Sequence, residues 1–481
     1  MSQTIFLNYI AGEWVKGNKD NIANISPADS KDIIGHYAQA DKTQTEEAIR
    51  AAAVGQLTWQ TSGLEQRYSV LMAIGDELIA RKDELGELLA REEGKTLAEG
   101  VGETYRSGQF FHYYAAEVLR QMGETADSVR PGVEIETRRE PVGVVGIITP
   151  WNFPTATGAW KIAPALAFGN AVVWKPANQV PASAWALTEI ISRQNLPAGT
   201  FNLVMGPGAD VGNVMIHSRY INALTFTGSL ETGRKVAAAT AVNLVKCQLE
   251  MGSKNALVVL DDADLENAVE CAVGGAFGGT GQKCTASSRL IVTEGIHDRF
   301  VAAMIERMKK LVVGHPLKAG VHIGAVADAR QMEQNLQYLE MAKKEGGTLA
   351  YGGNVLTEET DGYFMQPALF TNTTNQMTIN REEAFAPIAC IIKVKDYQEA
   401  LDTLNDTNFG LTGGICTTSL RYATDFKRQA KTGCVMINLP TAGTDYHVPF
   451  GGRKDSSFGP REQGTYAKEF YTVVKTTYMR A

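Results

Sequence analysis

Between Pro141 and Glu250 the chain alternates short apolar runs with longer amphipathic ones, and this alternation restricts the possible folds more than any other feature. The apolar runs are VGVVGIIT (142–149), NAVVWK (170–175), FNLVM (201–205), ALTF (223–226) and NLVKCQLE (243–250). We expect strands there, and helices near 159–168, 181–194, 209–217 and 229–240. Such strands, separated by helices, are typical of a parallel sheet covered on both faces. The pattern predicts a nucleotide-binding α/β domain whose ligand lies at the carboxyl ends of the strands.

The second half of the chain repeats this alternation. Strands are predicted at 255–262, 287–294, 388–394 and 433–438, with helices over 264–276 and 297–312. A chain of 481 residues is too long for one ordinary hydrophobic core, and its 44% hydrophobic content is that of a globular protein. We therefore expect a second α/β domain after the first.

Four flanking regions show other patterns. Residues 1–40 alternate apolar and polar side chains, which indicates short strands at a sheet edge. Residues 45–122 carry apolar side chains three and four apart, which predicts amphipathic covering helices. These helices are expected over 46–59, 65–96 and 105–119. Residues 123–140 are polar and strand-like and predict an extended arm or an inserted ribbon. The final segment, 467–480, also alternates like a strand, and such a strand can pair with another subunit.

Charge and composition argue against several classes of partner. The formal net charge is −7, the pI is near 5.7 and no long Lys/Arg run occurs, so we expect no nucleic-acid or anionic-membrane partner. The first residues lack the pattern of an export signal, and no apolar stretch approaches about 20 residues. The six cysteines are scattered without a C-x-x-C pair, which indicates neither a zinc site nor a disulfide framework. We expect a cytoplasmic, metal-free protein that acts on small metabolites.

A glycine-rich turn surrounds Cys284 in the segment FGGTGQKCTASS (277–288). Glycines let the main chain approach a ligand and leave backbone N–H groups free to face developing negative charge. A free thiol has a pKa of about 8.5, so it needs help from its surroundings to act as a nucleophile. A single cysteine can equally be a small buried hydrophobe. The local sequence leaves both interpretations open, and the rest of the chain favours the nucleophile.

Four further features stand where predicted strands end. Lys175 should emerge at the carboxyl edge of the sheet, where a ribose or phosphate would lie. Asn152, held between prolines in TPWNFP, could donate to an oxyanion or satisfy the loop backbone. The segment FTGS (226–229) would suit a pyrophosphate, or Ser229 is an ordinary N-cap. Glu250 is either paired structurally or a general base with a raised pKa.

Seven motifs, in their order and spacing, resemble the aldehyde dehydrogenase superfamily. They are TPWNFP, WKPA, FTGS, LEMGSKN, GQKC, EEAFAP and NLP…PFGGRK, and they extend over nearly the whole chain. Cys284 follows Glu250 by 34 positions (284 − 250), which is the spacing of that family's nucleophile and base. Each motif alone is weak evidence, whereas the ordered set is specific.

The resemblance implies a reaction. The cysteine that matches Cys284 attacks the aldehyde carbon, and Asn152 together with the Cys284 N–H holds the alkoxide. Hydride then leaves to the nicotinamide of NAD or NADP and produces a thioester, and Glu250 activates the water that releases the carboxylic acid. A thiol hydrolase or acyltransferase without redox chemistry is one alternative. A CoA-acylating semialdehyde dehydrogenase is another, although Glu250 favours hydrolysis.

The resemblance also implies cofactor contacts. Lys175 would contact the adenosine ribose, Gly228 and Ser229 the pyrophosphate region, and Glu383 with Phe385 the nicotinamide ribose and ring. Further cofactor candidates are Thr149, Trp151 and Asn178. Many NAD-preferring members carry Glu where this chain has Asn178, and a neutral amide does not repel a 2′-phosphate. We therefore expect that NADP is tolerated.

By the same resemblance, the chain divides into a Rossmann-type cofactor domain, an α/β catalytic domain and a small β oligomerisation arm. The cofactor domain would comprise residues 1–122 and 141–252, and the catalytic domain residues 253–460. The arm would comprise residues 123–140 and 461–481. A homodimer or homotetramer is the usual assembly.

Two departures from the common family pattern suggest a subgroup. Ser253 and Ala386 replace frequent glycines, and the segments around Cys284 and Pro449 resemble the α-ketoglutaric semialdehyde (2,5-dioxopentanoate) dehydrogenases of sugar-acid catabolism. Such a substrate carries a 2-oxo-carboxylate far from the aldehyde, so a cation or several donors should line the mouth of its site. The candidate substrate contacts are Arg106, Gln109, Phe153, Thr157, Thr285 and Phe450, and each could also be ordinary loop polarity or packing. Succinate semialdehyde and other small aldehydes are alternative substrates.

Overall fold

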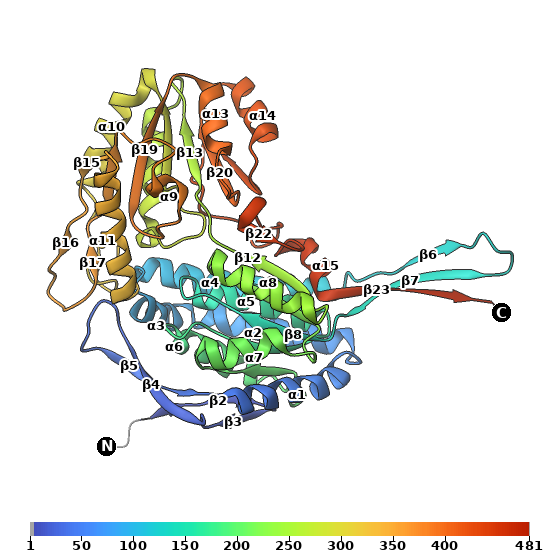
Figure 1. The fold of residues 1–481 in the computed structure, drawn as a ribbon. Helices are drawn as coiled ribbons and strands as arrows, with labels where there is room; N and C mark the ends of the chain where they lie inside the picture. Colours follow the sequence, from blue (N-terminus) through green and yellow to red (C-terminus); the bar gives the residue numbers. More distant parts are fainter. Residues whose placement is uncertain (1–3, 481) are drawn as a thin grey trace.

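The structure is a computed structural model that describes residues 4–480. The first of its two large sheets forms the lower body of the molecule in Figure 1. Its centre is five parallel strands in the spatial order β12-β11-β8-β9-β10. These strands are β8 (Val144–Ile148), β9 (Ala171–Lys175), β10 (Phe201–Leu203), β11 (Ala223–Thr227) and β12 (Lys246–Glu250). From β8 the chain moves outward through β9 and β10 and then crosses back to β11 and β12. The strand order therefore reverses between β8 and β11, which is where Rossmann-type sheets bind ligands.

Short antiparallel strands extend both edges of this sheet. β2 (Asn8–Ile10) pairs with β10 and β3 (Glu13–Val15) pairs with β2, as the alternation near the N-terminus predicts. At the opposite edge, β22 (Ser457–Phe458) pairs with β12. Residues more than 200 positions apart thus become neighbours beside Glu250, because Ser457 is its strand partner.

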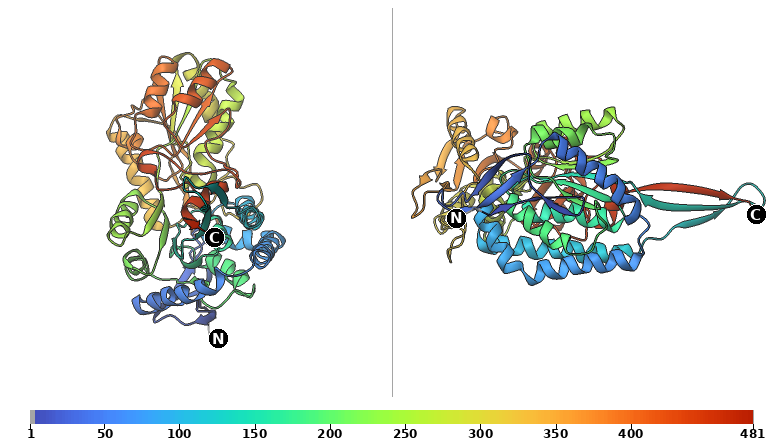
Figure 2. Two further views of the ribbon diagram at one scale, coloured as in Figure 1. Left: turned by 90° about the vertical axis from the view of Figure 1, so that its right-hand side faces the viewer. Right: turned by 90° about the horizontal axis from the view of Figure 1, so that it is seen from below.

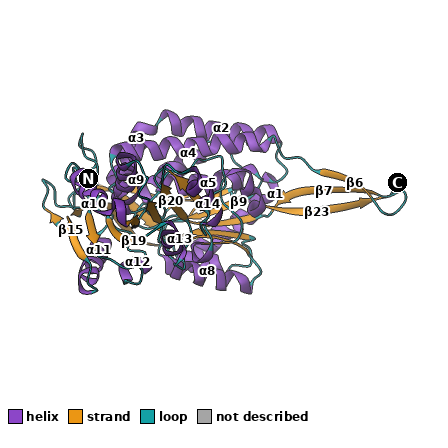
Figure 3. Ribbon diagram, turned by 90° about the horizontal axis from the view of Figure 1, so that it is seen from above, coloured by secondary structure: helices purple, strands orange, loops and turns teal. Residues whose placement is uncertain are grey.

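Helices cover both faces of the first sheet. They are α1 (Lys42–Trp59), α2 (Leu64–Ala80), α3 (Lys82–Glu93), α4 (Leu97–Val118), α5 (Pro154–Ala167), α6 (Pro181–Ser192), α7 (Asn213–His217) and α8 (Leu230–Val242). α2, α3 and α4 pack together along one side, as Figure 3 shows from above. The single helix predicted over 65–96 is wrong: it is divided at Arg81, whose backbone leaves helical geometry (φ −98°, ψ 14°) while its guanidinium pairs with Glu77, Glu84 and Glu189.

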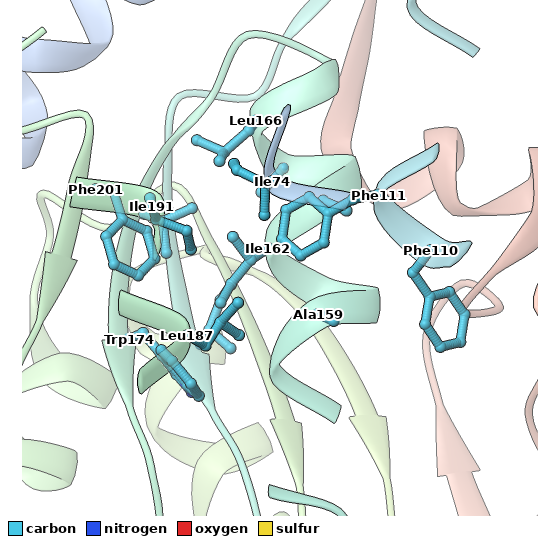
Figure 4. Close-up of a cluster of buried hydrophobic side chains, with 14 of the residues drawn as sticks. Ile74, Phe110, Phe111, Ala159, Ile162, Leu166, Trp174, Leu187, Ile191 and Phe201 are labelled. Carbon is cyan, nitrogen blue, oxygen red and sulfur yellow. The ribbon is translucent and has the colours of Figure 1, made fainter. Parts of the chain in front are cut away.

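On one face of this sheet, apolar side chains of the strands pack against α2, α4, α5 and α6 and form a hydrophobic core. Ile162, Trp174, Leu187 and Phe201 are fully buried there, and Figure 4 shows them in one cluster. Burying an aliphatic or aromatic side chain of this size stabilises the fold by about 1.5–3 kcal/mol. The strands have few polar residues because apolar layers cover them on both sides.

The second sheet forms the upper body and has the order β15-β18-β19-β14-β13-β20-β21. Its strands are β13 (Ala256–Val259), β14 (Arg289–Thr293), β15 (Thr348–Tyr351), β18 (Ala368–Thr371), β19 (Ile388–Val394), β20 (Thr412–Cys416) and β21 (Cys434–Ile437). All neighbours are parallel except β15 with β18. Its helices are α9 (Leu265–Phe277), α10 (Glu294–Met308), α11 (Ala329–Lys344), α12 (Thr378–Arg381), α13 (Tyr397–Asn405) and α14 (Leu420–Gln429). The predicted second α/β unit is confirmed.

A three-stranded antiparallel arm projects from the lower body, as Figure 1 and the right-hand view of Figure 2 show. It consists of β6 (Glu124–Asp127), β7 (Glu134–Pro141) and β23 (Thr472–Met479), with β7 in the middle. The strand predicted over 467–480 begins only at Thr472. The preceding residues form the short helix α15 (Lys468–Tyr471), which buries Phe470 and Tyr471 in the core.

Two smaller sheets complete the fold. β1 (Ile5–Phe6), β5 (Ile33–Gln39) and β4 (Lys19–Ile25) form one, and β16 (Val355–Leu356) pairs with β17 (Phe364–Met365) in the other. Among residues 4–480, no helix combines the length and apolarity needed to cross a membrane.

Candidate active site

Cys284 lies on the turn that connects α9 to β14. After α9, residues Gly279, Thr280 and Gly281 have φ angles of 59°, 57° and 67°. This left-handed backbone favours glycine, and a Cβ on Gly281 would also collide with the Ala386 carbonyl. The glycines of the sequence motif therefore turn the chain sharply and bring Cys284 to the space between the two sheets.

The peptide groups around Cys284 are held from the second sheet. Asn255 Nδ2 donates to the Cys284 carbonyl (2.7 Å) and to the Ala286 carbonyl (3.1 Å). Its Oδ1 accepts from the Thr412 N–H (2.9 Å) and from Ser253 Oγ (2.7 Å). One buried amide thus connects the thiol-bearing turn to β20 and to the residues that follow β12.

Two cavities meet at Cys284. The first, of about 340 Å³, lies at the carboxyl ends of β11 and β12, and the second, of about 280 Å³, lies against α4 and the 442–444 loop. Phe153, Trp160 and Phe450 line both. The sulfur is therefore accessible from two sides, as a reaction between two separately bound molecules requires.

The surroundings of Cys284 keep its thiol protonated in this state. Burial raises the pKa of the thiol, and the carboxylates of Glu383, Glu250 and Glu462 raise it further. The backbone N–H of Cys284 opposes these effects. A thiolate at this position needs a positive charge or a base that is brought near it.

Glu250 ends β12 and is buried at the edge of the first cavity. Ser457 Oγ donates to its Oε2 at 2.6 Å, and Gly451 leaves room for its other oxygen because a Cβ there would lie 2.6 Å from Oε1. Burial raises the pKa of Glu250 well above its usual range, and the nearby carboxylate of Glu462 adds to this, while Lys161 lowers it. A carboxyl group in this environment accepts protons readily, as a general base does.

Behind Glu250 lies a buried ion pair that the sequence analysis missed. Lys161, on α5, pairs with Glu462, and its Nζ also donates to Thr225 Oγ1 at 2.7 Å. The side chains of Lys161 and Glu462 are 0% and 2% exposed. A signal for Lys161 does exist, since it is the single charged residue in the otherwise uncharged helix 154–167.

Asn152 lines the first cavity, beside the Cys284 turn. Its Nδ2 donates to the Gln282 carbonyl (2.9 Å), and its own carbonyl accepts from Lys95 Nζ (2.6 Å). Lys95 also lies 4.2 Å from the centre of the Phe153 ring. The amide is thus fixed close to the turn that bears the thiol, where it could donate to an oxyanion.

The carboxyl end of β11 supplies the polar wall of the first cavity. Thr227, Gly228 and Ser229 line it, and Ser229 Oγ is the N-cap of α8, accepting from the Thr232 N–H at 3.3 Å. Thr227 Oγ1 is buried and has no hydrogen-bond partner in the described structure. Backbone N–H groups at a helix start and an unpaired hydroxyl together suit a phosphate-bearing ligand.

Glu383 and Phe385 form the opposite wall. Glu383 Oε1 accepts from the Ser253 N–H at 2.8 Å, and burial raises the pKa of Glu383 to about 7. Phe385 adopts φ 56° and meets Trp151 edge to face, with ring centres 5.5 Å apart. Glu383, Phe385 and Trp151 all line the first cavity, so the structure brings together residues from two separate sequence motifs, EEAFAP and TPWNFP.

Three residues expected to contact the cofactor lie outside the lining of this cavity. Thr149 is buried and its hydroxyl accepts from Trp174 Nε1 at 3.0 Å. Lys175 Nζ donates to the Pro176 carbonyl at 3.0 Å, and burial lowers the pKa of Lys175 to about 8. Asn178 is exposed and precedes Gln179, which does line the cavity.

Four of the substrate candidates reach the second cavity. Arg106, Phe153, Thr285 and Phe450 line it, whereas Thr157 lines the first cavity. The guanidinium of Arg106 lies 5.3 Å from the centre of the Tyr446 ring. Gln109, one turn further along α4, lines neither cavity.

The comparison with known sequences agrees with this geometry. Residues 14–477 match the aldehyde dehydrogenase family. The chain belongs to the aldehyde dehydrogenase family. It is therefore an oxidoreductase, and the recognition of the family from seven short motifs is confirmed.

Among curated aldehyde dehydrogenases, the chain is 41% identical to α-ketoglutaric semialdehyde dehydrogenase of Bacillus subtilis, with 99% of each chain covered. It is 38% identical to 2,5-dioxopentanoate dehydrogenase of Saccharolobus solfataricus, with 98% of each covered. Among solved structures, betaine aldehyde dehydrogenase of Staphylococcus aureus in complex with NAD+ superposes with a TM-score of 0.96 at 34% identity, covering 99% of this chain and 95% of that one. An E. coli NADP dependent enzyme matches with a TM-score of 0.95 at 33% identity, covering 99% of this chain and 98% of that one. The aldehyde dehydrogenase fold predicted from the sequence is thus confirmed.

Proposed function

We propose that this aldehyde dehydrogenase oxidises α-ketoglutaric semialdehyde to 2-oxoglutarate with NAD or NADP. The observation that carries the choice of substrate is Arg106, a cation in the cavity on the far side of Cys284 from the α8 start. Among residues 4–480 it has no acidic partner, and it rests on the Tyr446 ring. A carboxylate on the substrate would supply the missing partner. The names of the curated relatives support the same choice.

The first cavity fits a nicotinamide dinucleotide. Gly228 and Ser229 at the start of α8 and the unpaired Thr227 hydroxyl would receive the pyrophosphate. Because the Gly228 N–H donates to the Glu250 carbonyl (3.1 Å), Ser229 and Thr227 would supply the donors. Glu383 would accept from ribose hydroxyls, and Phe385 with Trp151 would support the nicotinamide ring. Lys175 and Asn178 would lie beside the adenosine ribose, and we expect NADP to be accepted because Asn178 brings no negative charge.

Each residue around Cys284 would then have a separate role in the reaction. The Cys284 thiol loses its proton to solvent and its sulfur adds to the aldehyde carbon, and the amide of Asn152 and the Cys284 N–H stabilise the alkoxide of the thiohemiacetal. When bound, the cofactor accepts a hydride from that carbon, which leaves a thioester on Cys284. Glu250 takes a proton from the water that attacks the thioester, so that the carboxylic acid and the free thiol are released.

The same proposal covers assembly and domain organisation. Residues 1–122 with 141–252 would bind the cofactor, residues 253–460 would complete the catalytic side, and the arm built from 123–140 and 461–481 would join subunits into a homodimer or homotetramer. The exposed outer strands of the arm support this assignment, because unpaired strand edges favour association. We place the enzyme in the cytoplasm, in sugar-acid catabolism.

The test is the initial rate of reduced-nicotinamide formation with α-ketoglutaric semialdehyde, succinate semialdehyde and propionaldehyde, each with NAD and with NADP. We expect the highest kcat/KM for α-ketoglutaric semialdehyde, and Arg106→Met should lower it by about 10- to 100-fold, as loss of a charge-assisted hydrogen bond does. Arg219→Met is the matched control, because Arg219 also lies over a ring, that of Tyr220 at 5.4 Å, outside both cavities. Equal kcat/KM values for propionaldehyde and α-ketoglutaric semialdehyde would exclude the proposed substrate. Turnover without formation of reduced nicotinamide would indicate a thiol hydrolase instead.

A further inference from the structure

Two lysine side chains, Lys95 and Lys283, line the second cavity, and each forms an ion pair with a glutamate. The two ion pairs differ in length and in exposure. Lys95 is enclosed: its Nζ lies 2.8 Å from Glu103 Oε2, and the two side chains are 4% and 2% exposed. Lys283 directly precedes Cys284, and its Nζ lies 3.3 Å from Glu99 Oε1. The side chains of Lys283 and Glu99 are 19% and 28% exposed, and both line the cavity. The second pair is thus longer and open to whatever enters.

The path of the Lys283 side chain depends on the glycine turn. A Cβ on Gly279 would lie 2.5 Å from Lys283 Cε, and one on Gly278 would lie 3.1 Å from Nζ. The ammonium therefore lies across two glycines beside the nucleophile, in space that any other residue would fill. The flexible side chain of Lys283 thus places a positive charge in the wall of the second cavity, next to Cys284.

Glu99 is the fixed half of the pair. Its Oε2 accepts from the Thr96 N–H (3.2 Å) and from Thr96 Oγ1 (3.0 Å), and Thr96 accepts from the Glu99 N–H in return. This capping box anchors Glu99 to the start of α4. Because Lys283 and Glu99 both line the cavity, a second carboxylate that enters it can compete with Glu99 for the Lys283 ammonium.

We propose that Lys283 is a specificity-determining residue that binds the anionic end of the substrate, and that Glu99 occupies its ammonium when no anionic substrate is present. Lys283 and Arg106 would then receive the carboxylate and the neighbouring oxo group together. This inference rests on the proposed function in one respect: the substrate must be an aldehyde that carries a carboxylate. It applies to short oxo-carboxylates as a class.

The experiment measures the selectivity ratio, which is kcat/KM for a carboxylate-bearing aldehyde divided by kcat/KM for propionaldehyde. α-Ketoglutaric and succinate semialdehydes are used in turn with the wild type, Lys283→Met, Lys283→Arg, Glu99→Gln and the double variant. We expect Lys283→Met to lower the ratio by about 10- to 100-fold and Lys283→Arg to keep more of it. Glu99→Gln should raise the ratio, since Gln preserves the capping box but no longer competes for Lys283. In the Lys283→Met background, Glu99→Gln should have no effect on the ratio.

A matched control is Lys309→Met, which breaks a Lys–Glu pair of 2.7 Å with Glu306 on the exposed face of α10 and should leave the ratio unchanged. An unchanged ratio in Lys283→Met, or a lowered ratio in Glu99→Gln, would overturn the proposal. If the wild type prefers succinate semialdehyde, the proposed function fails while Lys283 is still tested on that substrate. If the wild type does not distinguish carboxylate-bearing aldehydes from propionaldehyde, both proposals fail.

Discussion

Replacement of Lys161 by methionine should strongly destabilise the protein, because Lys161 and Glu462 form an ion pair without access to water. The methionine would leave the Glu462 carboxylate buried and unpaired, and its Oε2 already has no hydrogen-bond partner in the described structure. Breaking a buried pair in this way costs about 3–5 kcal/mol. We expect a loss of that size in the free energy of unfolding.

The assay is urea unfolding followed by tryptophan fluorescence, at one fixed protein concentration because association adds to apparent stability. Lys161→Met, Glu462→Gln and the double variant form a cycle, in which the double variant should be more stable than Lys161→Met. Lys235→Met is the control: its pair with Glu231 on α8 is exposed on both sides, and its loss should leave the free energy of unfolding nearly unchanged. The reasoning would be refuted by a cost below about 1 kcal/mol for Lys161→Met, or by additive losses in the double variant.

Further predictions concern the reaction itself. Cys284→Ala should abolish turnover while cofactor still binds, as measured by quenching of protein fluorescence. Glu250→Gln should slow thioester hydrolysis more than hydride transfer, so a pre-steady-state burst of reduced cofactor should remain; loss of the burst in both variants would contradict this division. Burial raises the pKa of Glu250, so its basic form appears at higher pH than that of an ordinary carboxyl group. The hydrolysis rate should therefore rise with pH above the usual carboxyl range, and a flat profile would argue against this role. Gly252→Ala should raise KM for the cofactor, because the new Cβ would collide with the Glu383 carboxylate; an unchanged KM would show that Glu383 is not needed in this position.

Much of the fold was predictable because its strands are buried on both faces. Residues 171–175, for example, are apolar up to Lys175 and are bounded by a glycine–asparagine turn and a proline, so the strand has clear ends. The break at Arg81 has no such signal, since neither glycine nor proline marks it, and one partner of its guanidinium, Glu189, lies 108 positions away. The helix at Lys468 was missed because aromatic residues such as Phe470 and Tyr471 are common in strands, while tertiary packing buries both in the core here.

The candidate site was predictable where chemistry requires a particular backbone, and less so where partners come from afar. Cys284 lies among glycines that the turn needs, and Glu250 ends a strand, so both are visible locally. Lys161 and Glu462 meet across 301 positions, a distance that no local pattern reveals. Gln109 follows Arg106 by three positions, yet the cavity lies against the face of α4 that carries Arg106 and Phe110 instead.

The position of Cys284 at the junction of two cavities separates two kinds of evolutionary change. In the proposed reaction, the cavity lined by Thr227, Glu383 and Phe385 would hold the cofactor, whereas the second cavity, lined by α4 and the 442–444 loop, would hold the aldehyde. Substitutions on α4 can therefore alter which aldehyde is accepted without moving the residues of the first cavity. A gene duplicate of this enzyme could acquire a new substrate by a few changes on that side alone, while it inherits the redox half of its chemistry intact.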